Sequence, residues 1–202
     1  MVSSKKKRFQ RELGDRPYLK LFVISVEGSR TEPLYFNIFK KNENFLIRLR
    51  CLDGTSGSDP SKVLRRIKEY LKNNRLKSSD EAWVVVDKDQ WSKEQLDLLH
   101  KWSLSRPNYG FSLTNPMFEF WILLHFEDGN GIGSPQILLE RLRRHIPNYQ
   151  KEINPDQFSP EMINLAIERA KKKDNPPCKG WPCTPFTTTV YRLVEKMTQS
   201  RH

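Results

Sequence analysis

Two short apolar runs, at residues 22–26 and 83–86, constrain the fold more than any other feature of the chain. Both are rich in valine and isoleucine or valine and tryptophan, which is typical of buried strands. Glu27 follows the first run, and Asp87 and Asp89 follow the second. Because the carboxyl ends of parallel strands meet at one edge of an open sheet, these carboxylates are expected to converge there.

Strand and helix patterns alternate over the first two thirds of the chain. Apolar periodicity predicts strands at 18–26, 45–52, 82–86 and 109–114, separated by helices that begin near residues 31, 60 and 92. Further helices are predicted at 135–146, 160–172 and 187–199. This order predicts an α/β protein with a mostly parallel central sheet flanked by helices, and a helical C-terminal extension.

Several helix starts combine a capping residue with proline at the first helical position, where the missing N–H has no helical partner to lose. Four pairs fit this pattern: Asp59-Pro60, Asn115-Pro116, Ser134-Pro135 and Ser159-Pro160. Ser92 and Gln95 predict a capping box. The second pair thus predicts that a helix begins at residue 116 and runs through the apolar segment after it.

Three parts are expected along the chain. Residues 1–16 are predicted to be a mobile basic arm, residues 17–128 the α/β core, and residues 129–202 the helical extension packed on that core. No stretch approaches the roughly 18 apolar residues of a membrane span, and the N-terminus lacks an apolar leader. Three cysteines make no disulfide framework, so a cytoplasmic location is expected, with no membrane partner.

The charge balance points to a polyanionic partner. The chain has 35 Lys and Arg against 24 Asp and Glu, for a formal net charge of +11. A positive field of this size attracts nucleic acid, although the same charge could serve solubility alone. Arg30, Lys88 and Asn115 are the candidate nucleic-acid contacts, the last because a helix N-terminus attracts phosphate.

Clustered carboxylates repel each other unless a hard cation joins them, and oxygen ligands suit Mg²⁺ or Mn²⁺. In extended chain, Asp87 and Asp89 point the same way, so both could reach one ion while Lys88 points elsewhere. Two such ions would stabilise the attacking and leaving oxygens of phosphodiester cleavage, with Lys88 or Arg30 near the transition state. The alternative is that these acids are ordinary polar residues at a strand end.

Two further acids have two interpretations each. Glu32 is either stabilised by the helix dipole behind a Thr31 cap or is a metal ligand. Glu119 lies within an apolar helix, so it either faces solvent or is buried with a partner and acts in catalysis. His125 on the same helix is expected to be a core residue. A zinc site at Cys178 and Cys183 is disfavoured by the ligand count.

Four segments together resemble the RloB-like family, which is associated with bacterial restriction and abortive phage-resistance loci. They are VEGSRTEP at 26–33 followed by YF at 35–36, WVVVDKD at 83–89, NPMFEFWILLHF at 115–126 and, more weakly, PFTTTVY at 185–191. The resemblance implies a Toprim-like fold. It implies that Glu27, Asp87 and Asp89 bind Mg²⁺, with Glu32 and Glu119 as secondary candidates.

Related Toprim proteins of phage defence work with an ABC-like ATPase and can cleave nucleic acid, including tRNA. The resemblance therefore favours a metal-dependent nuclease that acts on RNA or DNA in anti-phage defence. The alternative is a non-catalytic subunit that binds nucleic acid or regulates a defence ATPase complex. Expected partners are tRNA or DNA, an ABC-like ATPase and, in a homodimer, a second copy of the chain.

Overall fold

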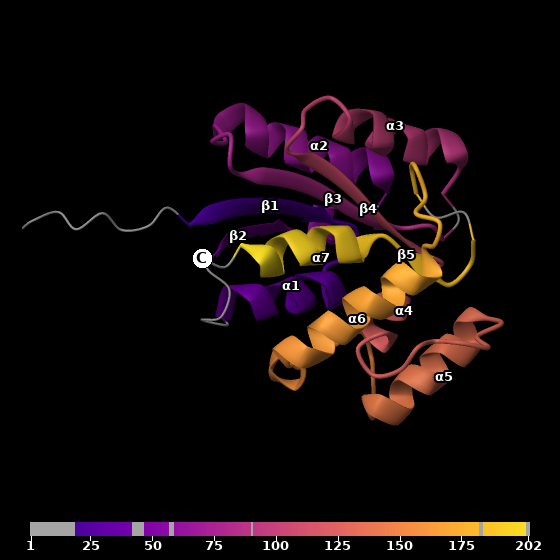
Figure 1. Cartoon of the computed structure of the whole chain (residues 1–202). Coiled ribbons are helices and arrows are strands. Elements are labelled where there is room, and N and C mark those ends of the chain that lie inside the picture. The colour runs from indigo at the N-terminus through magenta and orange to yellow at the C-terminus, as the bar shows by residue number, and fades with distance from the viewer. Residues whose placement is uncertain (1–18, 42–46, 57–58, 90, 182–183, 201–202) are drawn as a thin grey trace, which may run out of the picture.

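The computed structural model describes residues 19–41, 47–56, 59–89, 91–181 and 184–200. Figure 1 shows a central sheet with helices on both of its faces. The predicted basic arm at 1–16 lies outside the described residues. The predicted boundary at residue 128, between the α/β core and the helical extension, stays a prediction.

The sheet has five strands in the order β2-β1-β3-β4-β5. They are β1 (Lys20–Val26), β2 (Ile47–Leu52), β3 (Glu81–Asp87), β4 (Tyr109–Asn115) and β5 (Thr187–Thr188). The first four are parallel, and β5 is antiparallel to β4. The predicted α/β class with a mostly parallel sheet is confirmed, and the architecture is consistent with a Toprim-like fold.

Helices connect the parallel strands and then follow the last of them. These helices are α1 (Thr31–Lys41), α2 (Pro60–Asn73), α3 (Lys93–Ser103), α4 (Glu119–Leu123), α5 (Pro135–His145), α6 (Pro160–Lys173) and α7 (Val190–Gln199). Two 3₁₀ turns lie at Gly54–Ser56 and Pro155–Gln157. Within the described part of the chain, none of these helices combines the length and apolar character that crossing a membrane requires.

Most of the predicted helix starts are confirmed. Asp59, Ser134 and Ser159 accept hydrogen bonds from backbone N–H groups in the first turns of α2, α5 and α6, each with proline following. Ser92 and Gln95 form the predicted capping box of α3. These are local interactions, which is why the sequence pattern identifies them.

The two sheet faces bury separate hydrophobic clusters. Val23 and Val84 pack with side chains of α2 and α3 on one face. Phe22, Ile24 and Val85 pack on the other face with side chains of α1 and of α4 to α7. In Figure 1, α2 and α3 accordingly lie together on one side of the sheet, and α1 and α7 lie on the other.

Strand order reverses between β1 and β3, because β1 is followed by β2 on one side and paired with β3 on the other. α1 and α2, the helices of the first two crossovers, contribute to opposite clusters. In open α/β sheets, ligands bind outside the carboxyl ends of the strands at such a point. Glu27 and Asp87 are placed there by the topology.

Two predicted boundaries are wrong. Asn115 does not cap a helix: it is the last residue of β4, paired with Thr187, and α4 begins only at Glu119. The cap-and-proline pattern also fits a strand end followed by a turn, so the local signal is ambiguous there. The helix predicted over 187–199 begins at Val190, because its first residues form β5.

Candidate functional site

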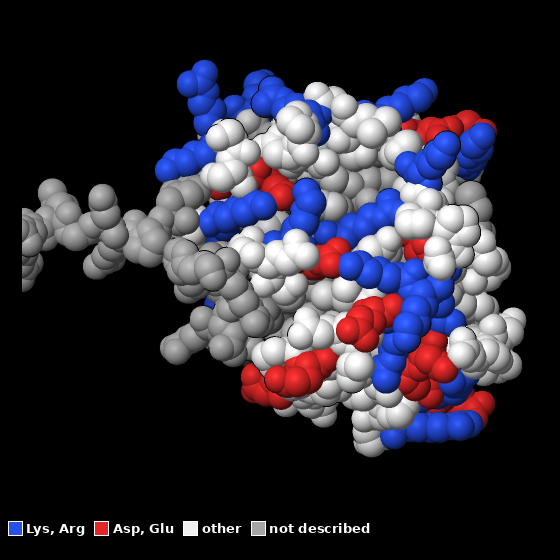
Figure 2. All heavy atoms as spheres, in the orientation of Figure 1, with Lys and Arg blue, Asp and Glu red and all other residues white. Residues whose placement is uncertain are grey.

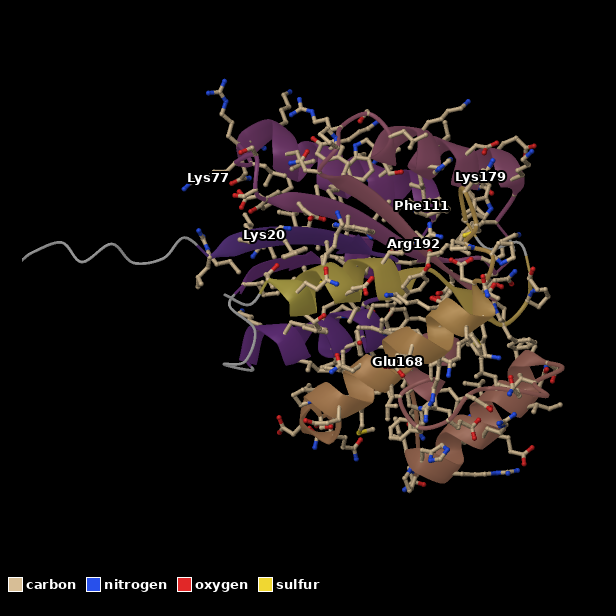
Figure 3. The ribbon with its side chains drawn as sticks, in the orientation of Figure 1. Lys20, Lys77, Phe111, Glu168, Lys179 and Arg192 are labelled. Atoms are coloured by element: carbon tan, nitrogen blue, oxygen red, sulfur yellow. The ribbon has the colours of Figure 1, made fainter. Side chains whose placement is uncertain are left out.

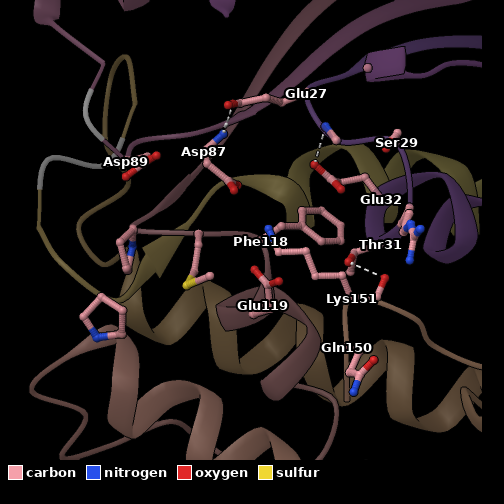
Figure 4. A pocket seen from close by; sticks show the side chains of 16 residues that line it. Glu27, Ser29, Thr31, Glu32, Asp87, Asp89, Phe118, Glu119, Gln150 and Lys151 are labelled. Atoms are coloured by element: carbon pink, nitrogen blue, oxygen red, sulfur yellow. Dashed lines mark hydrogen bonds between the residues drawn. The ribbon is translucent and has the colours of Figure 1, made fainter. Parts of the chain in front are cut away.

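A cavity of about 660 Å³ opens at the carboxyl edge of the sheet. Among the described residues, five carboxylates line it: Glu27, Glu32, Asp87, Asp89 and Glu119. They come from the ends of β1 and β3, from the first turn of α1 and from the start of α4. Figure 4 shows them around one space, together with Lys151 from the loop after α5.

Glu27 ties the ends of the two central strands together. Its backbone N–H donates to Val85 O at 3.2 Å, and its carboxylate accepts the Asp87 backbone N–H at 3.1 Å. The Trp91 indole N–H donates to the same carboxylate at 3.2 Å. Burial raises the pKa of Glu27 to about 7, despite these donors, and the neighbouring Glu32 and Asp89 add to the rise.

Asp87 and Asp89 both reach the cavity, but the reason predicted for it is wrong. β3 ends at Asp87, and Asp89 has a φ of 28°, so the two residues do not continue one extended strand. Burial raises the pKa of Asp87 well above its usual range, and the nearby Glu32, Glu27 and Glu119 raise it further. The turn after the strand, rather than strand alternation, brings Asp89 to the same cavity.

Glu32 is buried, with 7% of its surface exposed, and its carboxylate accepts the Gly28 backbone N–H at 2.9 Å. A Cβ on Gly28 would collide with that carboxylate, so a larger residue there would displace the Glu32 side chain. Burial, and then repulsion from Glu119, raises the pKa of Glu32. Thr31 does more than begin the helix, because its hydroxyl donates to Lys151 O at 2.9 Å.

Glu119 is buried, with 4% of its surface exposed, and the Tyr149 hydroxyl donates to its carboxylate at 2.8 Å. The solvent-facing alternative for Glu119 is therefore wrong. His125 is a core residue, as expected: it is hydrogen-bonded to the Tyr35 hydroxyl at 3.1 Å. Burial lowers the pKa of His125 to about 3, so the ring is neutral at physiological pH.

The three candidate nucleic-acid contacts lie in different settings. Arg30 is exposed at the cavity wall, where its guanidinium pairs with Glu152 at 3.2 Å. The Lys88 ammonium donates to Trp91 O at 2.8 Å, and neither Lys88 nor Asn115 is among the described residues that line the cavity. Because no helix begins at Asn115, the physical basis for placing phosphate there is lost. The roles of Arg30 and Lys88 stay predictions.

Several residues that face or support the site were missed by sequence reasoning. Lys151 and Gln150 line the cavity, Tyr149 binds Glu119, and Trp91 binds Glu27. Trp91 could have been suspected, since it follows Asp89 closely. The other three lie in an irregular segment far from the acidic motifs, and no periodicity or spacing connects them to those motifs.

The donor set fits a hard divalent cation in its chemistry: every candidate ligand is a carboxylate oxygen, and burial raises the pKa of three of them, Glu27, Glu32 and Asp87. Over the described ranges, however, no three Asp, Glu, His or Cys side chains are grouped closely enough to hold an ion as they stand. Glu27 and Glu32 instead bind backbone N–H groups. The zinc alternative involves Cys183, which lies outside the described residues.

A comparison with protein families gives one finding for most of the chain. The family model described as RloB-like protein matches residues 22–197. This match includes both acidic strand ends, the segment at 115–126 and the loop that contains Lys151. Neither the curated proteins nor the solved structures contain a match.

Proposed function

The chain belongs to the RloB-like family, and from this premise we propose that it is a metal-dependent nuclease that hydrolyses phosphodiester bonds of RNA, including tRNA, or of DNA in bacterial anti-phage defence. The observation that supports this proposal most is the convergence of five carboxylates on one cavity at the reversal point of the sheet. A cavity walled by buried acids within a chain of net charge +11 suits a metal ion and a polyanionic substrate.

In this proposal Glu27, Asp87 and Asp89 hold Mg²⁺ or Mn²⁺, and Glu32 is the further ligand. A bound divalent ion would activate water and neutralise charge on the scissile phosphate. To bind the ion, the carboxyl groups of Glu27 and Glu32 release the backbone N–H groups that now donate to them. They then turn toward the centre of the cavity. Such turns are side-chain rotations and need no change in the strands.

Other residues of the cavity have supporting roles in the proposal. Glu119, held by the Tyr149 hydroxyl at the floor of the cavity, orients the water or the ligands that surround it. Arg30 at the wall is exposed and available to the sugar-phosphate backbone. Lys88 contributes by closing the turn after β3 through its bond to Trp91 O, which keeps Asp87 and Asp89 on one side.

The test is cleavage of bulk tRNA and supercoiled plasmid with Mg²⁺ or Mn²⁺, comparing the wild type with Asp87→Asn. We expect the variant to lose cleavage by at least about 100-fold, because it loses a charged ligand while keeping the shape of the side chain. Glu168→Gln is the matched control, since Glu168 is an exposed carboxylate on α6 (Figure 3). Equal cleavage by wild type and Asp87→Asn would contradict the proposal.

A non-catalytic subunit that binds nucleic acid or regulates an ABC-like ATPase is the second candidate. The observation in its favour is that the described acids are not grouped for an ion as they stand. This subunit would bind nucleic acid equally well with and without a chelator, and would cleave nothing alone. If a partner ATPase is added and cleavage then appears with the wild type but not with Asp87→Asn, the protein is a gated nuclease instead.

A further inference from the structure

One basic side chain faces the acids of the cavity. Arg30 and Lys151 are the basic residues in the described lining, and the Arg30 guanidinium is paired with Glu152. In Figure 4 the side chain of Lys151 extends from its loop into the space between the carboxylates, toward Asp87 and Glu119. Its charge acts on two acids in particular, since it lowers the pKa of Glu32 and of Asp87 against the effect of burial.

The backbone holds Lys151 in this place. Lys151 has a φ of 65° and Asn148 a φ of 61°, so the segment makes a tight turn in the left-handed region. That conformation is strained for a residue with a Cβ, and it persists only where surrounding contacts enforce it. Two contacts do so here: the Thr31 hydroxyl donates to Lys151 O, and the buried Tyr149 binds Glu119.

The two contacts also connect the loop to the acidic site itself. Thr31 directly precedes Glu32 in α1, and Glu119 is one of the cavity acids. The loop is therefore fastened to the same elements that carry the carboxylates, and Lys151 is held at the cavity. Lys151 is itself exposed, so these contacts of its backbone and its loop keep the residue at the cavity.

We infer that Lys151 is an internal counter-cation of the acidic site, which holds the carboxylates together in the metal-free protein and is displaced when a divalent metal binds. The inference rests on the proposed function, because it takes these carboxylates to be metal ligands. The ammonium and a metal ion compete for the same carboxylates, so the lysine raises the metal concentration at which the site is half occupied. It is a positioning residue, and its displacement frees a cation at the cavity for the phosphate of the substrate.

The test measures Mn²⁺ affinity, by the signal of free Mn²⁺ in electron paramagnetic resonance, together with thermal unfolding in chelator. Lys151→Met is expected to unfold at a lower temperature without metal, yet to bind Mn²⁺ about 3- to 10-fold more tightly, because its competitor is gone. Lys151→Arg should resemble the wild type. So should Lys179→Met, which removes an exposed lysine that is not in the described lining (Figure 3).

A second variant guards against simple damage to the loop. Lys151→Gly fits a φ of 65° without strain and also removes the ammonium, so it too should bind Mn²⁺ more tightly. Unchanged or weaker Mn²⁺ binding by both variants, beside a wild type that binds, would overturn the inference alone. Failure of every protein, wild type included, to bind Mn²⁺ would overturn the proposed metal site and the inference with it.

Discussion

At the scale of single residues, two effects on the charge of Glu27 oppose each other in the metal-free protein: a hydrogen bond that favours the ionised carboxylate and burial that disfavours it. Its carboxylate joins β1 to β3 by accepting the Asp87 N–H, and this contact is best made by the ionised group. Its burial nevertheless penalises the charge and raises its pKa to about 7. A bound cation would stabilise the ionised form of such a carboxyl group. Strongly perturbed pKa values of this kind are frequent at functional sites.

The raised pKa of Glu27 predicts how stability depends on pH. Between the ordinary value of 4.5 and about 7, the unfolded chain releases the proton before the folded one. The protonated Glu27 carboxyl therefore stabilises the folded state fully below pH 4.5, and this contribution is lost as the pH rises through about 7. At pH 8 without metal, Glu27→Gln should be more stable than the wild type by on the order of 1–3 kcal/mol.

Urea denaturation in chelator at pH 4.5, 6 and 8 measures this difference, with Glu168→Gln as the control of equal charge change. Glu32 and Asp87, whose pKa values are also raised, contribute with the same sign in both proteins, and the measured difference includes the release of their repulsion from Glu27. Stability curves for wild type and Glu27→Gln that run parallel over this pH range would refute the prediction.

At the scale of elements, the loop after α5 connects two helices of the site, α1 and α4. Tyr149 is buried in it, donates to Glu119 at the start of α4 and lies 3.1 Å from the Thr31 hydroxyl of α1. One phenol thus connects two helices that are not adjacent along the chain. The loop has no periodicity of its own, and its conformation depends on these contacts.

Tyr149→Phe tests this connection. The substitution keeps the ring but removes the donor to a carboxylate that is 4% exposed, so we expect a loss of about 1–3 kcal/mol in the free energy of unfolding. Chemical denaturation near neutral pH measures it. Tyr70→Phe on α2 is the matched control and should change little. Equal stability of Tyr149→Phe and wild type would mean that the phenol does not hold the loop.

At the scale of the whole molecule, charge is distributed unevenly between surface and site. The formal net charge is +11, yet the cavity at the sheet edge is walled by acids. On the face seen in Figure 2, Lys and Arg side chains are spread over α6 and α7 with Asp and Glu among them. Such a surface attracts a polyanion without reading its sequence, while the acids leave an opening for a cation.

Nucleic-acid binding should accordingly depend steeply on salt. For about five phosphate contacts, affinity for tRNA or duplex DNA should fall by about 10²–10³-fold between roughly 50 and 200 mM monovalent salt. Fluorescence anisotropy in chelator measures binding without cleavage. Asp87→Asn should bind at least as tightly as the wild type, since it removes a negative charge. Binding that does not change with salt would show that the net charge serves solubility alone.

Four parallel strands, most helix starts and the positions of Glu27 and Asp87 at strand ends could be predicted from the sequence. Each of these follows from interactions within a few residues: alternation in a strand, a cap in a first turn, and an acid directly after a buried run. The cap-and-proline pattern failed at Asn115, where a strand end presents the same local chemistry as a helix start.

The burial of Glu119, its hydrogen bond from Tyr149 and the position of Lys151 facing the acids depend on contacts between distant parts of the chain. The short β5 likewise exists because β4 offers it a partner more than seventy residues away. No periodicity marks such contacts, because their energy is gained only after intervening segments have folded and closed the distance. The acids were visible in the chain, whereas the cation among them came from the fold.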